Sequence, residues 1–484
     1  MTSINTIFKE VLKDITPAQQ DLTLINDIIK KLKTLLDEKA QQLNIKYTKI
    51  EPQGSTGIKQ TQLKNDFDID LFVGLNYELY KPKYEGLSKN KLKKESKKDF
   101  LNLCNNWIKK SLTLKEFHNP RLLYAEHPYV TVDYISENSK IKIDIVLFFD
   151  LDLNFIDKYG PVTAVDRSPW HGHFIKNNLT EEQRNEVRIL KQFFKANHCY
   201  GDKSAVGKVG FIGYSAELLI SHYKTLQNLF SNFNLLKNNP IDFHNRSIND
   251  LTKIQHFQND YLIISDPIDK NRNVASAISE KAYKYCNQRI KEFLDNPSKK
   301  FFVIEEIPEI NISTINKSLV NNIFIVELKN ENTEKHYTIN RDKLYSIGDN
   351  VKSKGEKEVS HAERFGKIEF EVYFEADRED YNIAFYCEYP EIDKSYLRRG
   401  PPIKDKVHSD KFKQRNSGFF EKDGYLWVKT IRDYDTFKDY LKNFIINKIP
   451  ANLRIVNLSN AKETVTRSGK RSIYVLVNMV LPFP

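Results

Sequence analysis

Acidic residues in an otherwise apolar run are the feature that most constrains how this 484-residue chain can fold. The stretch GSTGIKQTQLKNDFDIDLFVGL begins at Gly54 and places acids at alternate positions, Asp66, Asp68 and Asp70. Alternation that passes into a continuous apolar run predicts a sheet strand over residues 66–74. Side chains two apart on a strand share a face, so Asp68 and Asp70 are expected side by side.

Two ionised carboxylates on one face raise each other's pKa and cost stability unless a cation joins them. Hard divalent cations, above all Mg²⁺, prefer oxygen ligands, and two such ions about 4 Å apart assist phosphoryl displacement. Such a site needs a third carboxylate from another strand, and KIKIDIVLFF supplies Asp144. We therefore predict Asp68, Asp70 and Asp144 as catalytic, metal-binding residues, with Asp66 as a surface or supporting acid. The alternative is a set of solvated acids on an edge strand.

A small turn, Gly54-Ser55, precedes these acids. Glycine permits close backbone approach, and serine offers a hydroxyl and an N–H group to a triphosphate. The turn alone is a weak signal. Followed by the alternating acids and an acid on a separate strand, it favours a nucleotide site at Gly54 and Ser55.

Charge and cysteine usage narrow the class of protein. The chain has 75 Lys and Arg against 64 Asp and Glu, a formal net charge of +11, which suggests a polyanionic partner such as nucleic acid or, less often, an anionic membrane. A basic soluble protein without such a partner is the alternative. Four widely separated cysteines without zinc-ligand spacing indicate reduced thiols in the cytoplasm. No apolar run approaches the roughly 20 residues that span a bilayer, so no membrane partner is expected.

Periodicity predicts helices and strands along the whole chain. A helix is expected from a Thr16 cap with Pro17 in its first turn, and it should end near Leu43. The lysine-rich segment 81–98 reads as a solvated helix face or as a phosphate contact. The other predicted elements are strands at 45–55, 129–135 and 140–149, helices at 181–198, 210–230 and 275–294, a loop at 231–250, and an α+β region after residue 301.

The order GS, DxD and a separate strand Asp resembles the nucleotidyltransferase superfamily that includes DNA polymerase β, poly(A) polymerases and oligoadenylate synthetases. More specific sequence motifs resemble those of the archaeal-type, class I CCA-adding enzymes over essentially the whole chain. The matching stretches, in order, are YAEHPYV from Tyr124, AVDRSPWHGHFI from Ala164, GFIGYSAELL from Gly210, SDPIDKNRNVA from Ser265, RRGPPIKDKVHSDKF from Arg398, and EKDGYLWVK after it.

The resemblance implies an enzyme that adds C, C and A to the 3′ end of tRNA from CTP and ATP without a nucleic-acid template. It implies two Mg²⁺ ions on the three acids and a C-terminal half that holds the tRNA acceptor stem and T-arm. It implies further nucleotide contacts at Ser55, Ser168, His171, Lys191, Tyr200 and Arg272. Arg272 would contact the incoming base, whereas Asp269 and Asn273 read as turn residues.

Two positions depart from the family pattern or stay open. Lys59 falls near an arginine of the family motif, but the loop GSTGIKQT is one residue longer, and lysine lacks the guanidinium fork. His171 and His173 form an HxH pair, which could contact nucleotide, bind metal or lie on the surface. Tyr200 could instead be an ordinary core aromatic.

We expect a multidomain α/β and α+β protein with a polymerase β-like catalytic head at 1–155. A helical neck that selects the nucleotide and base is expected at 156–298, and an α+β body and tail that bind tRNA at 299–484. An oligomer is possible. The rival functions are a poly(A) polymerase or oligoadenylate-type transferase, which would use ATP alone, and a non-catalytic RNA-binding relative.

Overall fold

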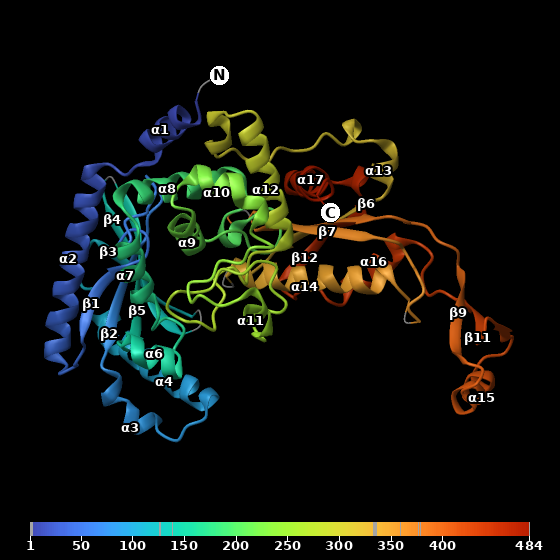
Figure 1. The fold of residues 1–484 in the computed structure, drawn as a ribbon, viewed down its shortest axis with the longest axis horizontal. Helices are drawn as coiled ribbons and strands as arrows, with labels where there is room; N and C mark the ends of the chain where they lie inside the picture. Colours follow the sequence, from blue (N-terminus) through green and yellow to red (C-terminus); the bar gives the residue numbers. More distant parts are fainter. Residues whose placement is uncertain are drawn as a thin grey trace. The chain divides into compact units, whose positions relative to one another are not determined.

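The computed structural model describes residues 3–124, 127–137, 139–332, 336–358, 360–375, 377 and 379–483 (Figure 1). It divides into two compact units. The first comprises Met1–Tyr200, Phe211–Ile278 and Asn287–Ile304, and the second Gly201–Gly210, Ser279–Cys286 and Glu305–Pro484. The three-part division into head, neck and body stays a prediction; residues expected in head and neck fall mainly in the first unit.

A five-stranded sheet organises the first unit, with strand order β1-β2-β5-β4-β3. Its strands are β1 Lys49–Gln53, β2 Ile69–Leu75, β3 Phe117–Tyr124, β4 Pro128–Ser136 and β5 Ser139–Phe149. The pair β2 and β5 is parallel, and the other pairs are antiparallel. On β5 every second side chain, Ile143, Ile145 and Leu147, is fully buried, which leaves Asp144 on the opposite face.

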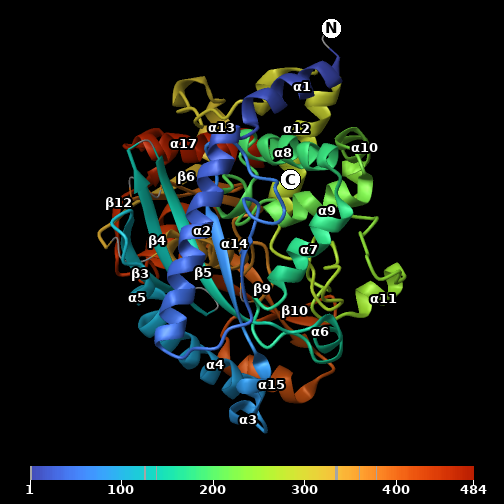
Figure 2. The same cartoon turned by 90° about the vertical axis from the view of Figure 1, so that its left-hand side faces the viewer.

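Helix α2, Gln19–Gln42, covers the apolar face of this sheet, as Figure 2 shows. Its Ile28, Leu32 and Leu36 are fully buried at helical spacing. Trp107, also fully buried, donates its indole N–H to the Leu36 carbonyl at 2.9 Å. The apolar stripe thus fixes which face of the sheet is core and which remains for polar side chains.

The start of α2 differs from the prediction. Thr16 does not cap α2; it ends the preceding helix α1, Ile4–Ile15, where its hydroxyl donates to the Leu12 carbonyl at 2.6 Å. The N-cap of α2 is Ala18, whose N–H is accepted by Asp21 at 3.0 Å. Helix α1 was not expected, and its closing hydrogen bond uses the threonine that the sequence pattern assigned to the next helix.

Helices after the sheet carry several predicted site residues. Helix α8, Glu181–Ala196, begins with a capping box in which Thr180 and Gln183 satisfy each other's backbone N–H groups. The helix predicted over 210–230 is broken at Lys224, whose φ is +67°. The other helices that belong to this unit or reach into it are α3 Lys81–Tyr84, α4 Lys89–Leu103, α5 Lys109–Ser111, α6 Leu153–Tyr159, α7 Ser168–Asn178, α9 Gly213–Tyr223, α10 Leu226–Asn232, α11 Ile248–Lys253 and α12 Glu280–Asp295.

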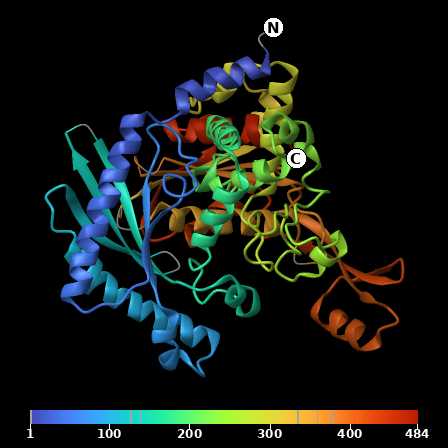
Figure 3. The ribbon, with the colours of Figure 1, turned by 60° about the vertical axis from the view of Figure 1, so that its left-hand side comes forward.

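The second unit contains an antiparallel sheet of order β12-β6-β8-β7 and a smaller one of order β10-β11-β9. The strands are β6 Ile323–Asn330, β7 Ile368–Glu375, β8 Asp380–Cys387, β9 Ser395–Pro402, β10 Phe420–Lys422, β11 Tyr425–Ile431 and β12 Leu453–Asn460. The helices are α13 Lys317–Asn321, α14 Tyr337–Glu356, α15 Lys406–Arg415, α16 Phe437–Ile446 and α17 Arg467–Val475. In Figures 1 and 3 the small sheet and α15 stand apart from the larger sheet of this unit.

The larger sheet is covered on both faces. Helices α14 and α16 pack on one core, and α17 packs on another. Gly348 of α14 permits close approach, since a Cβ atom there would lie 2.2 Å from the Phe370 ring. The expected α/β and α+β, multidomain class is confirmed. Among the described residues, no helix combines the length and apolar character needed to cross a membrane.

Candidate active site

The two predicted acids Asp70 and Asp144 lie directly opposite each other in the parallel β2 and β5 pair. The third, Asp68, lies one residue before β2, because the strand begins at Ile69 rather than at Asp66. Asp66 forms an ion pair with Lys195 instead. Strand register thus brings two acids together that are 74 positions apart in the sequence, with Asp68 at the entrance of the same strand.

Charge is concentrated at this pair. Burial, followed by the charges of Asp144 and Asp68, raises the pKa of Asp70 to about 6. Burial also raises the pKa of Asp68, opposed by Lys142. The Lys142 ammonium lies 2.7 Å from Asp144 Oδ2, whereas Asp144 Oδ1 is buried without a hydrogen-bond partner. The acid cluster is therefore only partly neutralised by the chain itself.

The Gly54-Ser55 turn lies against Asp70. Gly54 has φ +69°, and a Cβ atom there would fall 2.2 Å from Asp70 Oδ2. Both the left-handed backbone and the contact with a carboxylate require glycine. Ser55 is half-buried, and its carbonyl accepts the Thr61 N–H at 2.9 Å, which closes the loop that carries Lys59.

A cavity of about 440 Å³ opens beside the acid pair. It is lined by Gln53, Gly54, Lys59, Asp70, Phe72, His127, Tyr129, Asp144, Val146, Ala164, Val165, Ser168, His171, Tyr214 and Arg272. Seven predicted site residues are among them, drawn from three separate parts of the sequence. Four others, Ser55, Asp68, Lys191 and Tyr200, do not line this cavity.

His171 and Arg272 share one carboxylate. Asp266 Oδ2 accepts a hydrogen bond from Arg272 at 2.7 Å and lies 2.8 Å from His171 Nε2. Burial lowers the pKa of His171, while Asp266 opposes that effect. The His171 ring also packs on Tyr214, with centroids 4.4 Å apart. Asp266 therefore fixes the orientation of two side chains that face the cavity.

His173 takes a different direction from His171. The two lie two positions apart on α7, and a helix turns successive side chains by 100°. His173 is 37% exposed and lies 3.9 Å from Glu51 Oε2. The HxH pair thus does not converge on one point, which removes the paired-metal alternative.

Glu217 joins two predicted cations. Its carboxylate lies 2.7 Å from Lys59 Nζ and 3.2 Å from Lys191 Nζ, and it accepts the Thr61 hydroxyl at 2.6 Å. Burial would raise the pKa of Glu217, but Lys59 and Lys191 outweigh burial and lower it to about 2. Burial lowers the pKa of Lys191, which is 4% exposed. Lys191 therefore holds the loop through Thr61 and Glu217.

Tyr200 lies near Lys191 rather than in the cavity. A Cβ atom at Gly213 would be 3.1 Å from the Tyr200 hydroxyl and 3.5 Å from Lys191 Nζ. Lys195 lies over the Tyr200 ring at 5.2 Å. Burial raises the pKa of Tyr200, which keeps its hydroxyl as a hydrogen-bond donor.

Two of the three predicted acids are arranged so that they could bind a divalent cation. Within the described ranges, no group of three or more His, Cys, Asp or Glu side chains is placed to hold a metal ion. The pair Asp70 and Asp144 nevertheless fits such an ion, because its donors are carboxylate oxygens, one of them buried and unpartnered. Asp68 does not complete a three-carboxylate set in this arrangement.

Sequence reasoning missed Asp266, Glu217, Tyr214 and His127 as site residues. Asp266 lies in SDPIDKNRNVA, and Glu217 and Tyr214 lie in GFIGYSAELL. The motifs therefore contained these residues, but the sequence did not show which side chains they pair with. His127 lines the cavity from the stretch YAEHPYV; residues 125 and 126 of that stretch lie outside the described residues.

Comparisons with known proteins agree along the chain. Residues 185–303 match the family model for the second domain of tRNA nucleotidyltransferase. The CCA-adding enzyme of Methanocaldococcus jannaschii is 29% identical and covers 97% of this chain and 95% of that protein. Those of Saccharolobus solfataricus and Methanococcus maripaludis are 29% and 28% identical, over 94% and 92% of this chain and 96% and 92% of those proteins.

Among solved structures, Cid1, an RNA terminal uridylyl transferase, is similar with a TM-score of 0.46 and 13% identity; the match covers 63% of this chain and 100% of that one. This likeness is distant, and nothing further follows from it. The sequence similarity to the CCA-adding enzymes, by contrast, extends over almost the full length of both proteins in each pair. The chain is therefore a homologue of archaeal CCA-adding enzymes along almost its whole length.

Proposed function

We propose that the chain adds C, C and A to the 3′ end of tRNA, using CTP and ATP and releasing pyrophosphate. The observation that carries this proposal is the pairing of Asp70 with Asp144 in a cavity that also contains Arg272, His171 and Lys59. Relatives named CCA-adding enzymes align along 92–97% of the chain, which supports this reaction over another nucleotidyl transfer.

Asp70 and Asp144, with Asp68 beside them, would hold divalent cations, for which we propose two Mg²⁺ ions. Such ions, when bound, lower the pKa of the attacking 3′-hydroxyl and offset charge on the leaving pyrophosphate. Asp70 and Asp144 would orient the tRNA 3′ end because their carboxylates come from adjacent strands with fixed register. The tRNA oxygen bonds to the α-phosphorus as the bond to the β-phosphate breaks.

The remaining cavity residues would bind the incoming nucleotide. Arg272 would donate to acceptor edges of cytosine or adenine, and Asp266 would hold its guanidinium in one orientation. His171 and Ser168 would contact phosphates from the first turn of α7. The turn at Gly54 and Ser55 would bring backbone N–H groups to the triphosphate.

Lys59, Lys191 and Tyr200 would act around the cavity. Lys59 lines it and would contribute positive charge, moderated by Glu217. Lys191 donates to the Thr61 hydroxyl of the loop and pairs with Glu217 of α9, so we propose that Lys191 positions the phosphate-binding loop. Tyr200 lies beside Lys191 near the start of α9, and we propose that it supports Lys191 from there.

We further propose that the α+β unit holds the acceptor stem and T-arm of tRNA. The net charge of +11 favours contacts with phosphates, and contacts to backbone and shape would serve every tRNA regardless of sequence. The four cysteines are buried as thiols, which suits a reducing compartment, the cytoplasm.

The test is nucleotide addition to a tRNA transcript that lacks CCA, read by sequencing its 3′ end. We expect CC with CTP alone and CCA with CTP plus ATP. Asp70→Asn and Asp144→Asn should abolish growth while tRNA binding persists, and Asp27→Asn, at an exposed acid of α2, serves as the matched control. Adenosine tails on any RNA would point to a poly(A)-type enzyme, and tRNA binding without growth to a non-catalytic relative.

A further inference from the structure

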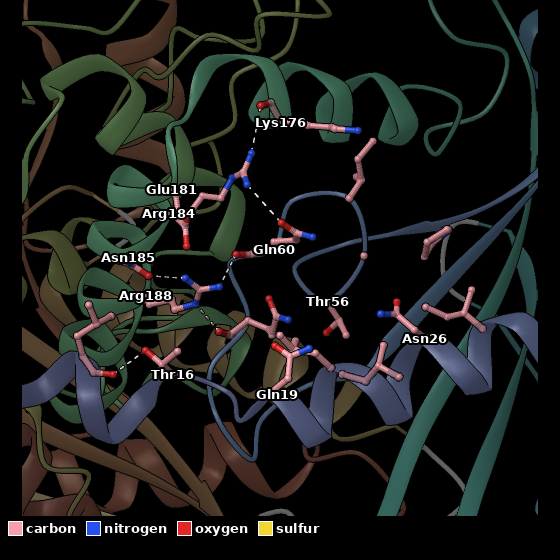
Figure 4. Close-up of a pocket in the computed structure, with 18 of the residues that line it drawn as sticks. Thr16, Gln19, Asn26, Thr56, Gln60, Lys176, Glu181, Arg184, Asn185 and Arg188 are labelled. Atoms are coloured by element: carbon pink, nitrogen blue, oxygen red, sulfur yellow. Dashed lines mark hydrogen bonds between the residues drawn. The ribbon is translucent and has the colours of Figure 1, made fainter.

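A second and larger groove lies in the first unit, away from the candidate active site. Its volume is about 1180 Å³, and it is bounded by α1, α2, α7, α8 and the loop between β1 and β2. Figure 4 shows Thr56 and Gln60 on that loop, with the α8 side chains Arg184 and Arg188 on one side and Gln19 and Asn26 of α2 below. The catalytic acids do not line this groove, and neither does Arg272, the residue proposed to contact the base.

Positive charge gathers along this groove. Its lining includes five Lys and Arg side chains, Lys9, Lys13, Lys176, Arg184 and Arg188, against two glutamates, Glu51 and Glu181. Arg184 and Arg188 are four positions apart on α8 and therefore neighbours. Burial, and then the charge of Arg184, lowers the pKa of Arg188. An anion placed between the two walls would relieve this repulsion, and phosphate matches guanidinium geometry.

Three buried polar atoms of the same lining have no hydrogen-bond partner: Thr56 Oγ1, Gln62 Oε1 and Arg184 Nε. Thr56 is 7% exposed and Gln62 is 2% exposed, so bulk water does not compensate. Buried polar groups are normally paired, and an unpaired one destabilises the fold. Their presence together in one groove points to a ligand.

The types of these atoms restrict what that ligand can be. Gln62 Oε1 only accepts hydrogen bonds, so a bare phosphate anion cannot satisfy it, whereas an amino group or hydroxyl can. Arg184 Nε only donates and suits a phosphate or carbonyl oxygen. One wall is apolar, formed by Leu12, Leu22, Ile25 and Ile29. A phosphate, hydroxyl or amino donors, and an apolar face occur together in a ribonucleotide.

We propose that this groove is a second ribonucleotide-binding site, separate from the candidate active site. Its ligand is a phosphorylated nucleoside, either free or as a unit of an RNA strand. The phosphate binds Arg184 and Lys176. Thr56 and Gln62 bind the hydroxyl or amino groups of the ribose or base, and the α2 side chains pack on the base.

The site connects to the catalytic cavity through a single loop. Gly54 and Lys59 line the cavity, whereas Thr56, Gln60 and Gln62 line the groove. Arg188 donates to the Gln60 carbonyl at 2.6 Å and the Gln62 carbonyl at 3.0 Å. A ligand in the groove therefore contacts the loop that also carries residues of the candidate active site. The binding proposal itself does not depend on the reaction proposed above.

The test is photo-crosslinking of the full chain, with the labelled peptides mapped by mass spectrometry. The probes are 8-azidoadenosine triphosphate and a short oligoribonucleotide that contains 4-thiouridine. We expect saturable labelling of peptides within residues 9–29 and 176–188, in addition to labelling of the cavity. Competition with unlabelled ATP or unlabelled oligoribonucleotide then separates a free nucleotide from a unit of RNA.

Two variants challenge the assignment. Thr56→Val keeps the side-chain shape and removes a hydroxyl that has no partner in the fold, and Arg184→Gln removes the guanidinium. Each should weaken groove labelling about three- to tenfold, the loss of one or two hydrogen bonds. Ser472→Ala is the matched control, since it removes another buried, unpartnered hydroxyl, in the second unit.

The outcomes are distinguishable. Labelling confined to the cavity, or groove labelling that neither variant weakens, overturns the proposal. If Arg184→Gln fails to fold, Thr56→Val decides the question by itself. Groove labelling in a protein that adds no nucleotide to tRNA would support this site and refute the proposed function. CCA addition without groove labelling would support the proposed function and refute this site.

Discussion

Replacing Asp70 by asparagine should stabilise the metal-free protein at neutral pH while abolishing activity. Asp70 faces Asp144 across the parallel strands, and burial together with the neighbouring carboxylates raises the pKa of Asp70 to about 6. Above that pH the folded protein holds a charge that burial and like charges disfavour. Asparagine keeps the shape and removes the charge.

The magnitude follows from the difference in pKa between folded and unfolded states. The ordinary pKa is 3.8, so the shift to about 6 corresponds to about 3 kcal/mol at 1.36 kcal/mol per unit. Because the folded-state pKa is raised, the favourable contribution is present below pH 3.8 and is lost as pH rises through 6. Asp70 keeps partial solvent contact, so we expect a measured gain of about 1–3 kcal/mol above pH 7.

Urea unfolding in EDTA at pH 5.0, 6.0, 7.0 and 8.0 measures this gain. The difference between Asp70→Asn and wild type should grow from pH 5 to pH 8, and Asp27→Asn should show no such trend. Added Mg²⁺ should stabilise wild type and not the variant, since only wild type offers the paired carboxylates. A variant no more stable than wild type at pH 8 would refute the reasoning, because it would mean that Asp70 is not held against unfavourable charge.

Three further perturbations test the site. Glu217→Ala should lower the free energy of unfolding by about 3–5 kcal/mol, because it leaves the buried Lys191 ammonium and the half-buried Lys59 ammonium without their carboxylate; an unchanged urea midpoint would contradict this. Asp266→Asn should reduce discrimination against UTP and GTP, measured as kcat/KM for each nucleotide, since Arg272 loses its charged partner; unaltered selectivity would exclude that role. Gly54→Ala should abolish nucleotide addition and lower the free energy of unfolding by about 1 kcal/mol or more, since it places a Cβ atom against Asp70 at a positive φ. Gly418→Ala is the control, because Gly418 also has a positive φ but has open space around it, so it reports the backbone strain without the contact.

Much of the fold could be predicted from local patterns. The alternation in KIKIDIVLFF predicted a strand, and in β5 Asp144 lies opposite the buried Ile143 and Ile145 because side chains on a strand alternate by geometry. Boundaries were less accurate: β2 begins after Asp68, and Thr16 closes α1 rather than opening α2. The start of β2 was decided by its pairing with β5, which begins at Ile69 and Ile143. The end of α1 was decided by a local hydrogen bond from the Thr16 hydroxyl to the Leu12 carbonyl.

The sequence by itself determined the residue types of the site and the resemblance to CCA-adding enzymes, because motifs and their order are properties of the linear chain. Tertiary structure alone decided the pairing of Asp70 with Asp144, since strand order and register depend on non-local hydrogen bonds. It also decided that Asp266 serves both His171 and Arg272, although the histidine and the aspartate are 95 positions apart. Likewise Glu217 neutralises two lysines from different elements. A buried charge is costly unless an opposite charge or a hydrogen-bond partner lies beside it, and only the folded chain determines which side chain is close enough to be that partner.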